Sequence, residues 1–288
     1  MKLSIITINW NNREGLRKTI ESVLGQTARE QFEYVVVDGA STDGGKEMLE
    51  NEYADRIDKW ISEPDKGIYN AMNKGVRMAS GEYCVVLNSG DVYHENHTIG
   101  DVLPFLHDED MVIGKMRFMS TGLLMQAPNP ISLLGLHERS IPHNAAFVKR
   151  DLLLRFPFDE NFRIVSDWKF FVQSLILHNA SYRLIDMIVT DFDCGGVSAR
   201  NRDVCGEERH AILKDLFPER VLQDYYQFTK GTGYTGSDYD RFYVKLRNYR
   251  AGERIYALNV RIMRILSRFK KSARWARDYP IRLKGKWR

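Results

Sequence analysis

The sequence is poor in cysteine and has no long apolar run. Only three cysteines occur in the 288 residues, Cys84, Cys194 and Cys205, and no two of them form a Cys-x-x-Cys pair. An odd number at this wide spacing excludes a readable disulfide framework or zinc knuckle, and it favours a reducing compartment such as the cytoplasm. No run of about 18 apolar residues occurs, so we expect no membrane-spanning helix.

The composition is that of an ordinary globular protein. Hydrophobic residues make up 43% and charged residues 28% of the chain, which excludes intrinsic disorder and a collagen-like structure. The length allows one large domain or two modest ones, and such a chain can bury a core without a metal or a disulfide. The apolar run from Leu3 to Ile8 is too short for a signal peptide, and we interpret it as a first strand.

Charge is distributed unevenly along the chain. Residues 241–288 contain 16 lysines and arginines but only two acids, Glu253 and Asp278, which gives this segment a net charge of +14. Because the whole chain carries +4, residues 1–240 carry −10. The sequence therefore describes an acidic body with a strongly basic tail.

The first hundred residues alternate between short β-branched runs and helix-like patterns, which is typical of βαβ units. The patterns predict strands at 3–8, 33–38, 59–62 and 82–87, and helices at 13–25, from 46 onward and at 69–79. Beyond residue 92 they predict two short strands at 111–113 and 115–119, helices at 147–154 and 167–178, and a late strand at 182–190. We therefore expect an α/β fold with a mostly parallel sheet.

Polar residues follow the predicted strands at their carboxyl ends, where open α/β sheets bind ligands. These residues are Asn9, Asp38, Glu63, Asp65 and the stretch Asn88 to Asp91. No GxGxxG follows the first strand and no GxxxxGK[ST] occurs, which disfavours a dinucleotide-binding dehydrogenase and a P-loop NTPase. Taken singly, Asp91 is also explained as a turn residue, and the glycine-rich stretch 38–45 as a turn before a helix.

Several segments resemble, in order and spacing, the family 2 glycosyltransferases. The segments are SIITINWN at 4–11, VVVDGASTD at 35–43, DKGIYNAMNKG at 65–75, SGEY at 80–83 and LNSGD at 87–91. The resemblance covers about residues 1–200 and is closest to bacterial enzymes that build exopolysaccharide, capsule or O-antigen units. It implies a GT-A fold, which is a Rossmann-like α/β domain that binds a nucleotide sugar.

The resemblance also assigns donor-binding residues. Thr7 and Asn9 match the loop that lies against the nucleoside, and Asp38 matches the aspartate that accepts a hydrogen bond from the base, usually uracil. Lys66 and Asn73 match positions near the donor, where a cation close to a diphosphate is electrostatically favourable. A UDP-sugar donor is therefore expected.

The turn after the fourth predicted strand resembles a DxD-type metal motif. Asp91 matches its last, metal-binding acid, whereas Asn88 replaces the first acid and Ser89 stands in the middle on the donor side. Together with two diphosphate oxygens and waters, one aspartate would complete an oxygen shell for Mg²⁺ or Mn²⁺. The resemblance thus implies a metal-dependent enzyme.

The segment IVSDWKFF at 164–171 matches the part of the family whose acid activates the acceptor hydroxyl. Asp167 is the expected general base, and its alternative role is that of an acid at a helix N-terminus. His143 lies in a second matching segment, PHNAAF at 142–147, where it contacts acceptor or diphosphate or else packs as a structural histidine.

A single carboxylate suffices for an inverting displacement, because the acceptor loses its proton to that base while it attacks opposite the leaving UDP. We expect a non-processive hexosyl- or N-acetylhexosaminyltransferase whose acceptor is lipid-linked or an oligosaccharide. Arg274-Trp275 lies too late in the chain for the Gln/Arg-x-x-Arg-Trp segment of processive members. The alternatives are a sugar nucleotidyltransferase, which normally has a glycine-rich basic loop where residues 9–13 stand, and a catalytically inactive assembly scaffold.

The basic tail has the pattern of a surface-seeking helix. From Arg254 to Trp275 apolar residues recur at spacings of three and four between basic residues, which predicts an amphipathic helix. An anionic membrane surface would attract this helix. The alternative is that the helix docks on the protein's own acidic body. The sequence shows no nucleic-acid recognition fold. We predict a GT-A domain at 1–205 and a basic helical extension at 206–288 that holds the protein peripherally at the inner face of the cytoplasmic membrane.

Overall fold

The computed structural model describes residues 1–193 and 202–229. The chain divides into two units, Met1–Leu222 and Gln223–Arg288, and the fold below is that of the first. Cys194 and the predicted amphipathic helix at 254–275 lie outside the described residues. The predicted boundary near residue 205 therefore stays a prediction. No helix of the described part combines the length and the apolarity needed to cross a membrane.

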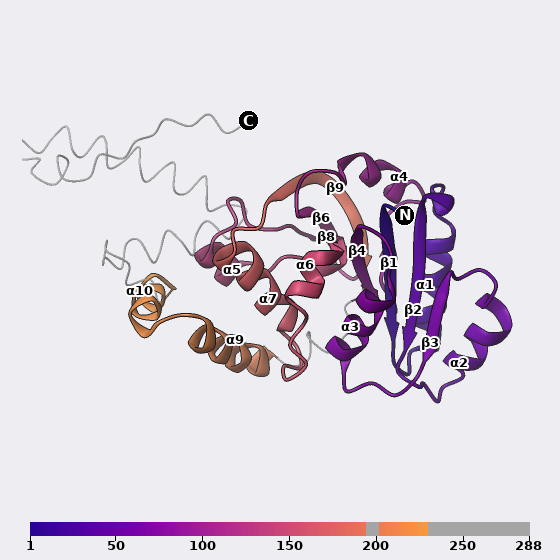
Figure 1. Cartoon of the computed structure of the whole chain (residues 1–288), viewed down its shortest axis with the longest axis horizontal. Helices are drawn as coiled ribbons and strands as arrows, with labels where there is room; N and C mark the ends of the chain where they lie inside the picture. The colour runs from indigo at the N-terminus through magenta and orange to yellow at the C-terminus, as the bar shows by residue number, and fades with distance from the viewer. Residues whose placement is uncertain (194–201, 230–288) are drawn as a thin grey trace, which may run out of the picture. The chain divides into compact units, whose positions relative to one another are not determined.

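Nine strands of the described part form one mixed sheet (Figure 1). Their order is β3-β2-β1-β4-β8-β6-β9-β5, with β7 paired to β6. The first four strands in this order are mutually parallel, and β8 joins them antiparallel. The strands are β1 (Leu3–Asn9), β2 (Phe32–Asp38), β3 (Lys59–Ser62), β4 (Tyr83–Asn88), β5 (Val92–Tyr93), β6 (Met111–Phe118), β7 (Leu124–Met125), β8 (Ala146–Lys149) and β9 (Tyr182–Phe192).

The connections between the strands are mostly helical. The α-helices are α1 (Arg13–Leu24), α2 (Gly45–Met48), α3 (Ile68–Met78), α4 (Thr98–Val102), α5 (Leu133–Glu138), α6 (Arg150–Arg155), α7 (Ser166–Phe171), α9 (Arg202–Leu216) and α10 (Glu219–Thr229). Short 3₁₀ turns are η1 (Arg29–Gln31), η3 (Leu103–Phe105) and η4 (His143–Ala145), and π-helical turns are η2 (Leu49–Tyr53) and η5 (Val172–Leu177).

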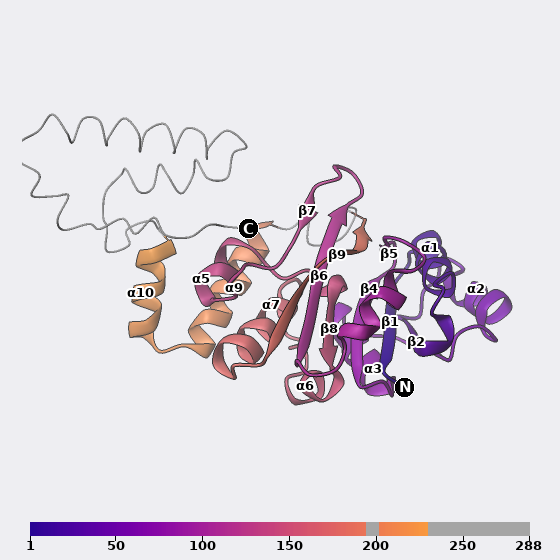
Figure 2. The same ribbon diagram turned by 90° about the horizontal axis from the view of Figure 1, so that it is seen from above.

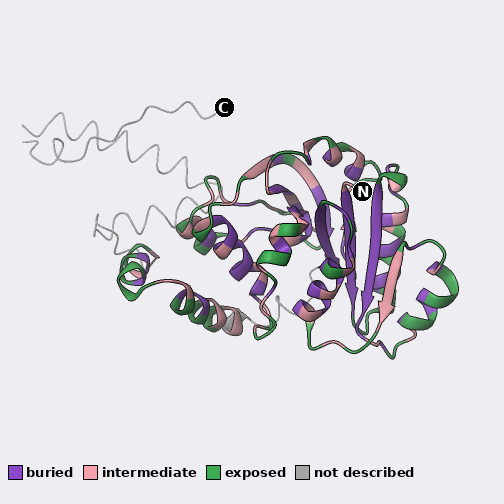
Figure 3. Cartoon of the chain, in the orientation of Figure 1, coloured by how far each residue is buried: buried purple, intermediate pink, exposed green. Residues whose placement is uncertain are grey.

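Helices cover both faces of the parallel strands (Figure 2). Because successive side chains of a strand point to opposite faces, Ile5 packs with Leu16 of α1 while Ile6 meets α3 on the other side. A Cβ at Gly75 would lie 2.3 Å from Ile6 Cγ2, so this close approach of α3 requires glycine. Both β1 and β2 are buried along their whole length (Figure 3), as strands between two helical layers should be.

A buried carboxylate ties the parallel strands together at their amino ends. Glu33 of β2 accepts hydrogen bonds from Ser4 (2.5 Å) and Ser80 (2.8 Å) and pairs with Lys59 of β3 (2.7 Å). Burial raises the pKa of Glu33, but these donors outweigh the burial and hold it at about 2. The ionised carboxylate is therefore part of the fold's stability.

The α/β architecture expected from the sequence is confirmed, and the predicted strands and helices up to residue 88 agree with the structure within two residues. Two predictions were wrong. The segment 147–154 is not one helix, because Phe147 and Val148 are buried as strand β8 between β4 and β6, and α6 begins only at Arg150. The two short strands predicted after 111 are the single strand β6, whose pairing with β9 shifts register at Gly114 and Lys115.

Candidate active site

The carboxyl ends of β1, β2 and β4 meet in one polar network, as the strand-end rule predicts. Asn9 at the end of β1 donates from Nδ2 to Asp38 Oδ1 at the end of β2 (2.7 Å). Ser89, which follows β4, donates from Oγ to Asn9 Oδ1 (2.7 Å). Asn9 therefore links the second strand to the turn after the fourth.

Asp38 is the centre of this network and is completely buried. Its carboxylate accepts hydrogen bonds from Asn9, from the hydroxyl (2.6 Å) and backbone N–H (3.0 Å) of Ser41, and from Ser62 (2.6 Å). Burial raises the pKa of Asp38, but these donors hold it below its usual range. With no exposed surface and four protein donors, the carboxylate orders the loop after β2 and presents no free oxygen to a base.

A cavity of about 800 Å³ opens beside this network, a volume within the range of small-molecule sites. Asn88, Ser89 and Asp91 line one part of it, and His143 and Asp167 line another. Five of the ten residues predicted from the sequence therefore face one cavity. Among its further lining residues are Trp10, Asn11, Asn12, Tyr69, Met116, Phe118, Met125, Asn144, Arg163, Trp168, Phe192, Asp193, Cys205 and Arg209.

Asp91 enters the cavity wall because the turn before it is tight. Gly90 adopts φ +108°, a conformation that L residues rarely take. The Asp91 carboxylate is 1% exposed and accepts hydrogen bonds from Asn144 Nδ2 (3.1 Å) and from the backbone N–H of Asp193 (3.2 Å). Burial raises its pKa to about 6, because these neutral donors only partly replace water.

This environment of Asp91 fits a divalent cation. Within residues 1–193 and 202–229 the hydrogen-bond partners of the Asp91 carboxylate are the neutral Asn144 amide and Asp193 backbone N–H, and His143 is the nearby group whose positive charge lowers its pKa. Asp193 Oδ2 would lie 3.1 Å from a Cβ on Gly90, which places a second carboxylate beside the same turn. No cluster of three or more His, Cys, Asp or Glu side chains that could hold a metal occurs in the described part, so substrate oxygens and waters would have to complete the shell.

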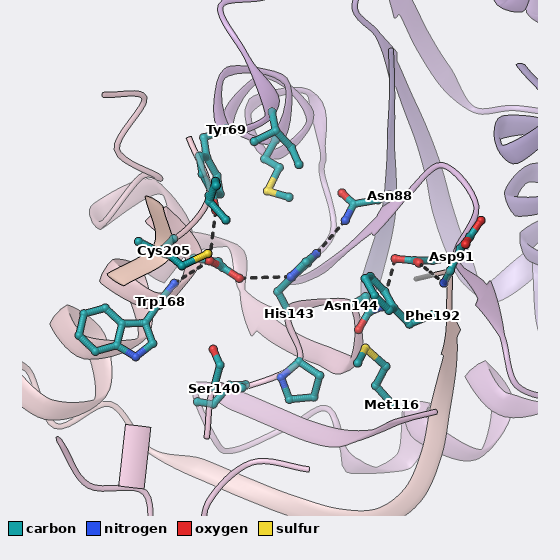
Figure 4. A pocket seen from close by; sticks show the side chains of 18 of the residues that line it. Tyr69, Asn88, Asp91, Met116, Ser140, His143, Asn144, Trp168, Phe192 and Cys205 are labelled. Carbon is teal, nitrogen blue, oxygen red and sulfur yellow. Dashed lines mark hydrogen bonds and ion pairs between the residues drawn. The ribbon is translucent and has the colours of Figure 1, made fainter. Parts of the chain in front are cut away.

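His143 connects the two sides of the cavity (Figure 4). Its Nδ1 lies 3.3 Å from Asp167 Oδ2, and its Nε2 lies 3.3 Å from Asn88 Nδ2. Burial lowers the pKa of His143, but the hydrogen bond to Asp167 and the negative charges of Asp167 and Asp91 outweigh it and raise the pKa. Asn88 Oδ1 has no partner; exchanging the amide oxygen and nitrogen would let Oδ1 accept from a protonated Nε2.

Asp167 is held at the N-terminus of α7 with one oxygen partly free. Oδ1 accepts hydrogen bonds from the Trp168 backbone N–H (2.8 Å) and the Tyr69 hydroxyl (3.2 Å). Burial and the Asp167 charge raise the pKa of Tyr69 well above its usual range, so the phenol stays protonated and donates. Oδ2 meets only His143 within the described part, which leaves it a lone pair for an incoming hydroxyl.

Five predicted donor residues are not among the residues that line the cavity. Asn9 and Asp38 belong to the polar network beside it, and the other three lie elsewhere. Thr7 is completely buried one pleat below the strand end, where its Oγ accepts from the Tyr34 hydroxyl (3.0 Å). Asn73 is 5% exposed and binds both the N–H and the C=O of Phe158 (3.0 and 2.8 Å), so its amide holds that segment on α3. Lys66 is exposed before α3 but is not a lining residue. The structure thus places Thr7 and Asn73 in internal hydrogen bonds and Lys66 at the surface, and their donor-binding roles stay predictions.

Sequence reasoning missed several residues of the cavity. Trp10 directly follows the first strand and is 69% exposed. Its position next to Asn9 at a strand end is a sequence signal that could have identified it. Asn144 stands next to His143 and could have been found with it. Arg209 lies on α9, more than forty residues after Asp167, and no local pattern marks it.

The sheet and its flanking helices have the architecture of the GT-A glycosyltransferases. S. aureus TarS in complex with UDP superposes with a TM-score of 0.58 at 21% identity, over 67% of this chain and 60% of the TarS chain. A longer S. aureus TarS structure gives a TM-score of 0.61 at 20% identity, over 85% of this chain and 46% of that chain. The protein therefore has the GT-A fold, although it spans less than two thirds of each TarS chain.

Sequence comparison identifies the family. The model of Glycosyl transferase family 2 matches residues 4–149, just over half of the chain. An uncharacterized glycosyltransferase of Mycobacterium tuberculosis is 29% identical over 224 residues, or 74% of this chain and 81% of that one. A PGL/p-HBAD biosynthesis glycosyltransferase of Mycobacterium bovis is 29% identical over 203 residues, or 68% and 78%. The chain belongs to glycosyltransferase family 2 and is a nucleotide-sugar-dependent glycosyltransferase.

Proposed function

We propose that this protein is an inverting, non-processive enzyme that transfers a hexose or N-acetylhexosamine from a UDP-sugar to a lipid-linked or oligosaccharide acceptor in surface polysaccharide synthesis. The observation that carries the proposal is the pair Asp91 and Asp167 on one cavity. Two neighbouring residues, His143 and Asn144, contact Asp167 and Asp91 respectively. The carboxylate proposed to bind a metal and the carboxylate proposed to accept a proton thus line the same cavity.

The UDP-sugar donor is proposed from two observations. S. aureus TarS, which shares the fold, has been solved with UDP and with UDP-GlcNAc. In this chain, Trp10 exposes an aromatic face at the cavity on which a base can stack. Asn11 Oδ1 accepts from the backbone N–H of Thr42 (2.8 Å), so the loop that Asp38 orders is joined to the loop that carries Trp10.

Asp91 is proposed to hold Mg²⁺ or Mn²⁺, with Asp193 beside it. Such an ion would neutralise the charge that develops on the leaving diphosphate. The fit rests on a buried carboxylate that lines the cavity and whose pKa burial raises to about 6. Asn144 orients this carboxylate through its Nδ2, and Asn88 and Ser89 complete the turn on the donor side.

Asp167 is proposed to take the acceptor proton. The acceptor hydroxyl donates to Oδ2 and its oxygen attacks the anomeric carbon opposite UDP, so that the sugar inverts and no covalent enzyme intermediate is needed. Tyr69 and the Trp168 N–H occupy Oδ1 and thereby aim Oδ2. His143 Nδ1 contacts Oδ2 at 3.3 Å.

A lipid-linked acceptor is supported by an exposed apolar hairpin beside the cavity. Met116, Phe118 and Met125 at the base of the β6–β7 hairpin line the cavity. At its tip Met119, Leu123 and Leu124 are 46%, 66% and 50% exposed. Apolar side chains at both the base and the tip of the hairpin suit contact with the hydrocarbon chain of an acceptor at a membrane surface. The +14 segment 241–288 would add attraction to anionic lipid, and peripheral membrane association is proposed on these two grounds.

Acceptor-independent hydrolysis across a panel of UDP-, GDP- and dTDP-sugars tests the activity directly. We expect slow release of UDP from one UDP-sugar in the presence of Mn²⁺, because water can replace the acceptor at Asp167. No release from any donor, together with no calorimetric binding of UDP, would contradict the proposal and favour an inactive scaffold. Formation of a nucleotide sugar from UTP and a sugar phosphate would instead identify a nucleotidyltransferase.

A further inference from the structure

The helix that presents Asp167 begins after a residue that cannot cap it. Helix α7 follows Val165, whose hydrocarbon side chain offers no acceptor to the N–H groups around a helix start. A carboxylate from another helix supplies the acceptor. Glu208 of α9 accepts hydrogen bonds from the backbone N–H groups of Arg163 (2.8 Å), Ile164 (3.0 Å) and Val165 (3.2 Å). The loop before α7 is thus held by a side chain that lies 43 residues after Val165.

Two further contacts fasten α9 to α7, and the two helices lie side by side (Figure 1). Lys169 of α7 pairs with Asp215 of α9 at 3.1 Å. The Arg209 guanidinium, next to Glu208, lies 5.1 Å from the centre of the Trp168 ring. Because α9 is anchored at both of these points, it presents the Glu208 carboxylate to the loop from a fixed support.

The position of this loop decides where the proposed base lies. Asp167 stands two residues after Val165, so a shift of the loop backbone also moves the Asp167 carboxylate. Backbone N–H groups that lose their acceptor are costly, and without Glu208 the loop would move toward other partners. A general base acts only within hydrogen-bond reach of the proton that it takes, and a displacement of about 1 Å can lower a rate by ~10²-fold. The contact between Glu208 and the loop should therefore affect the rate of the reaction.

Glu208 acts on the loop from outside the cavity. Among the described residues, Arg163, Ile164 and Val165 line the cavity, whereas Glu208 is not in its lining. We propose that Glu208 is a positioning residue, whose carboxylate holds the loop 163–165 so that Asp167 Oδ2 meets the acceptor hydroxyl. The proposal rests on the proposed function, because it needs Asp167 to be the base. A residue that only stabilises the fold would instead affect UDP binding and any activity that remains without the base.

A double-mutant cycle with Asp167→Asn in the full-length enzyme tests this role. The assay is the acceptor-independent release of UDP from UDP-glucose, UDP-galactose, UDP-GlcNAc and UDP-GalNAc with Mn²⁺, in which water takes the place of the acceptor. We expect Glu208→Ala to lower kcat by roughly 10- to 100-fold and to leave the calorimetric affinity for UDP unchanged. In the Asp167→Asn background the same substitution should lower the remaining rate by less than about twofold, because no base is left to position.

Two variants complete the design. In Glu208→Gln the amide oxygen can still accept from the N–H groups of Ile164 and Val165, so this variant should recover part of the rate that Glu208→Ala loses. If Glu208→Ala does not fold, Glu208→Gln carries the cycle, with a smaller loss that also disappears in the Asp167→Asn background. Glu207→Ala is the matched control, because it removes the same charge at the adjacent, exposed position of α9, and its kcat should be that of the wild type.

Three results would overturn the role of Glu208 and leave the proposed function intact. They are a wild-type kcat in Glu208→Ala, an equal fold-loss of rate in the Asp167 and Asp167→Asn backgrounds, and a loss of UDP affinity in Glu208→Ala. A different pair of results refutes the proposed function, and the role of Glu208 with it. These are a wild-type rate in Asp167→Asn alone, or a wild-type enzyme that binds no UDP and hydrolyses none of the four donors.

Discussion

Replacing Asp167 with asparagine separates chemistry from binding at the reaction centre. The amide keeps an oxygen where Oδ1 accepts from Tyr69 and from the Trp168 backbone N–H. It puts an N–H group where Oδ2 faced His143 Nδ1 at 3.3 Å. The substitution therefore removes the one oxygen that has a lone pair for the acceptor hydroxyl, while the shape of the side chain is preserved.

The expected loss of rate is far larger than the expected loss of stability. A positioned general base contributes about 10²- to 10⁴-fold to the rate, which corresponds to roughly 3 to 5 kcal/mol of transition-state free energy. The fold loses only the His143 contact, at about 1 kcal/mol for one hydrogen bond. Trp168, which follows Asp167 directly, and Asp91 lie on opposite sides of His143 (Figure 4), so the affinity for UDP should stay within about twofold.

Steady-state kinetics and UDP calorimetry on the same protein sample measure both quantities. Asp159→Asn is the control: Asp159 pairs with Lys169 of α7 at 2.8 Å but does not line the cavity, so kcat should be that of the wild type. If Asp167→Asn retains kcat within about tenfold, the base lies elsewhere and the reasoning from Oδ2 is refuted. If UDP affinity falls together with kcat, Asp167 acts on the donor and the separation of the two ends is wrong.

Three further predictions follow from other parts of the chain. The pKa of Glu33 is held at about 2 against an ordinary 4.5, so its carboxylate stabilises the fold above pH 4.5 and this contribution disappears as the pH falls toward 2; Glu33→Gln should lower the free energy of unfolding by up to about 3 kcal/mol at neutral pH, and an equal loss at pH 7 and pH 3 would contradict this. Mn²⁺ should raise the melting temperature of the wild type but not of Asp91→Asn, and an equal rise in both would remove Asp91 from the metal site. Leu123→Ser with Leu124→Ser should reduce turnover of a long-chain lipid-linked acceptor and leave turnover of a water-soluble analogue unchanged; equal effects on both acceptors would exclude lipid contact at the hairpin.

The proposed donor half of the site could be predicted from local sequence because parallel strands end at one edge of the sheet. Asn9, Asp38 and Ser89 come together for that reason alone, and the turn at Gly90 brings Asp91 to the same edge. Position in the sequence does not reveal how deeply a side chain is buried. Thr7 stands only two residues before Asn9 on the same face of β1, but Tyr34 covers it, so its hydroxyl belongs to the core.

The proposed acceptor half depends on packing between segments that are distant in the sequence. Asn73 looks like a site residue in the sequence, but its amide is used to bind Phe158, eighty-five residues away. No local sequence pattern identifies Arg209 as a cavity residue. Its position is set by the neighbouring Glu208 of α9, which binds the loop before α7, and by the ring of Trp168. These contacts join α7 and α9, which are far apart in the sequence. Neither helix has a sequence pattern from which its contact with the other could be predicted.

One short turn, η4, sets the distance between Asp91 and Asp167, the two carboxylates proposed to act in the reaction. His143 and Asn144 are adjacent, and their side chains reach Asp167 and Asp91 respectively. Asn144 is completely buried, so the turn cannot slide without leaving its amide and the Asp91 carboxylate unpaired. Strand β8 begins at the end of η4 and pairs with β6 and β4, which fixes the turn to the sheet that carries Asn88 at the end of β4. The distance between Asp91 and Asp167, the carboxylates proposed for the metal and for the acceptor proton, is therefore fixed by this turn and by the sheet that holds it.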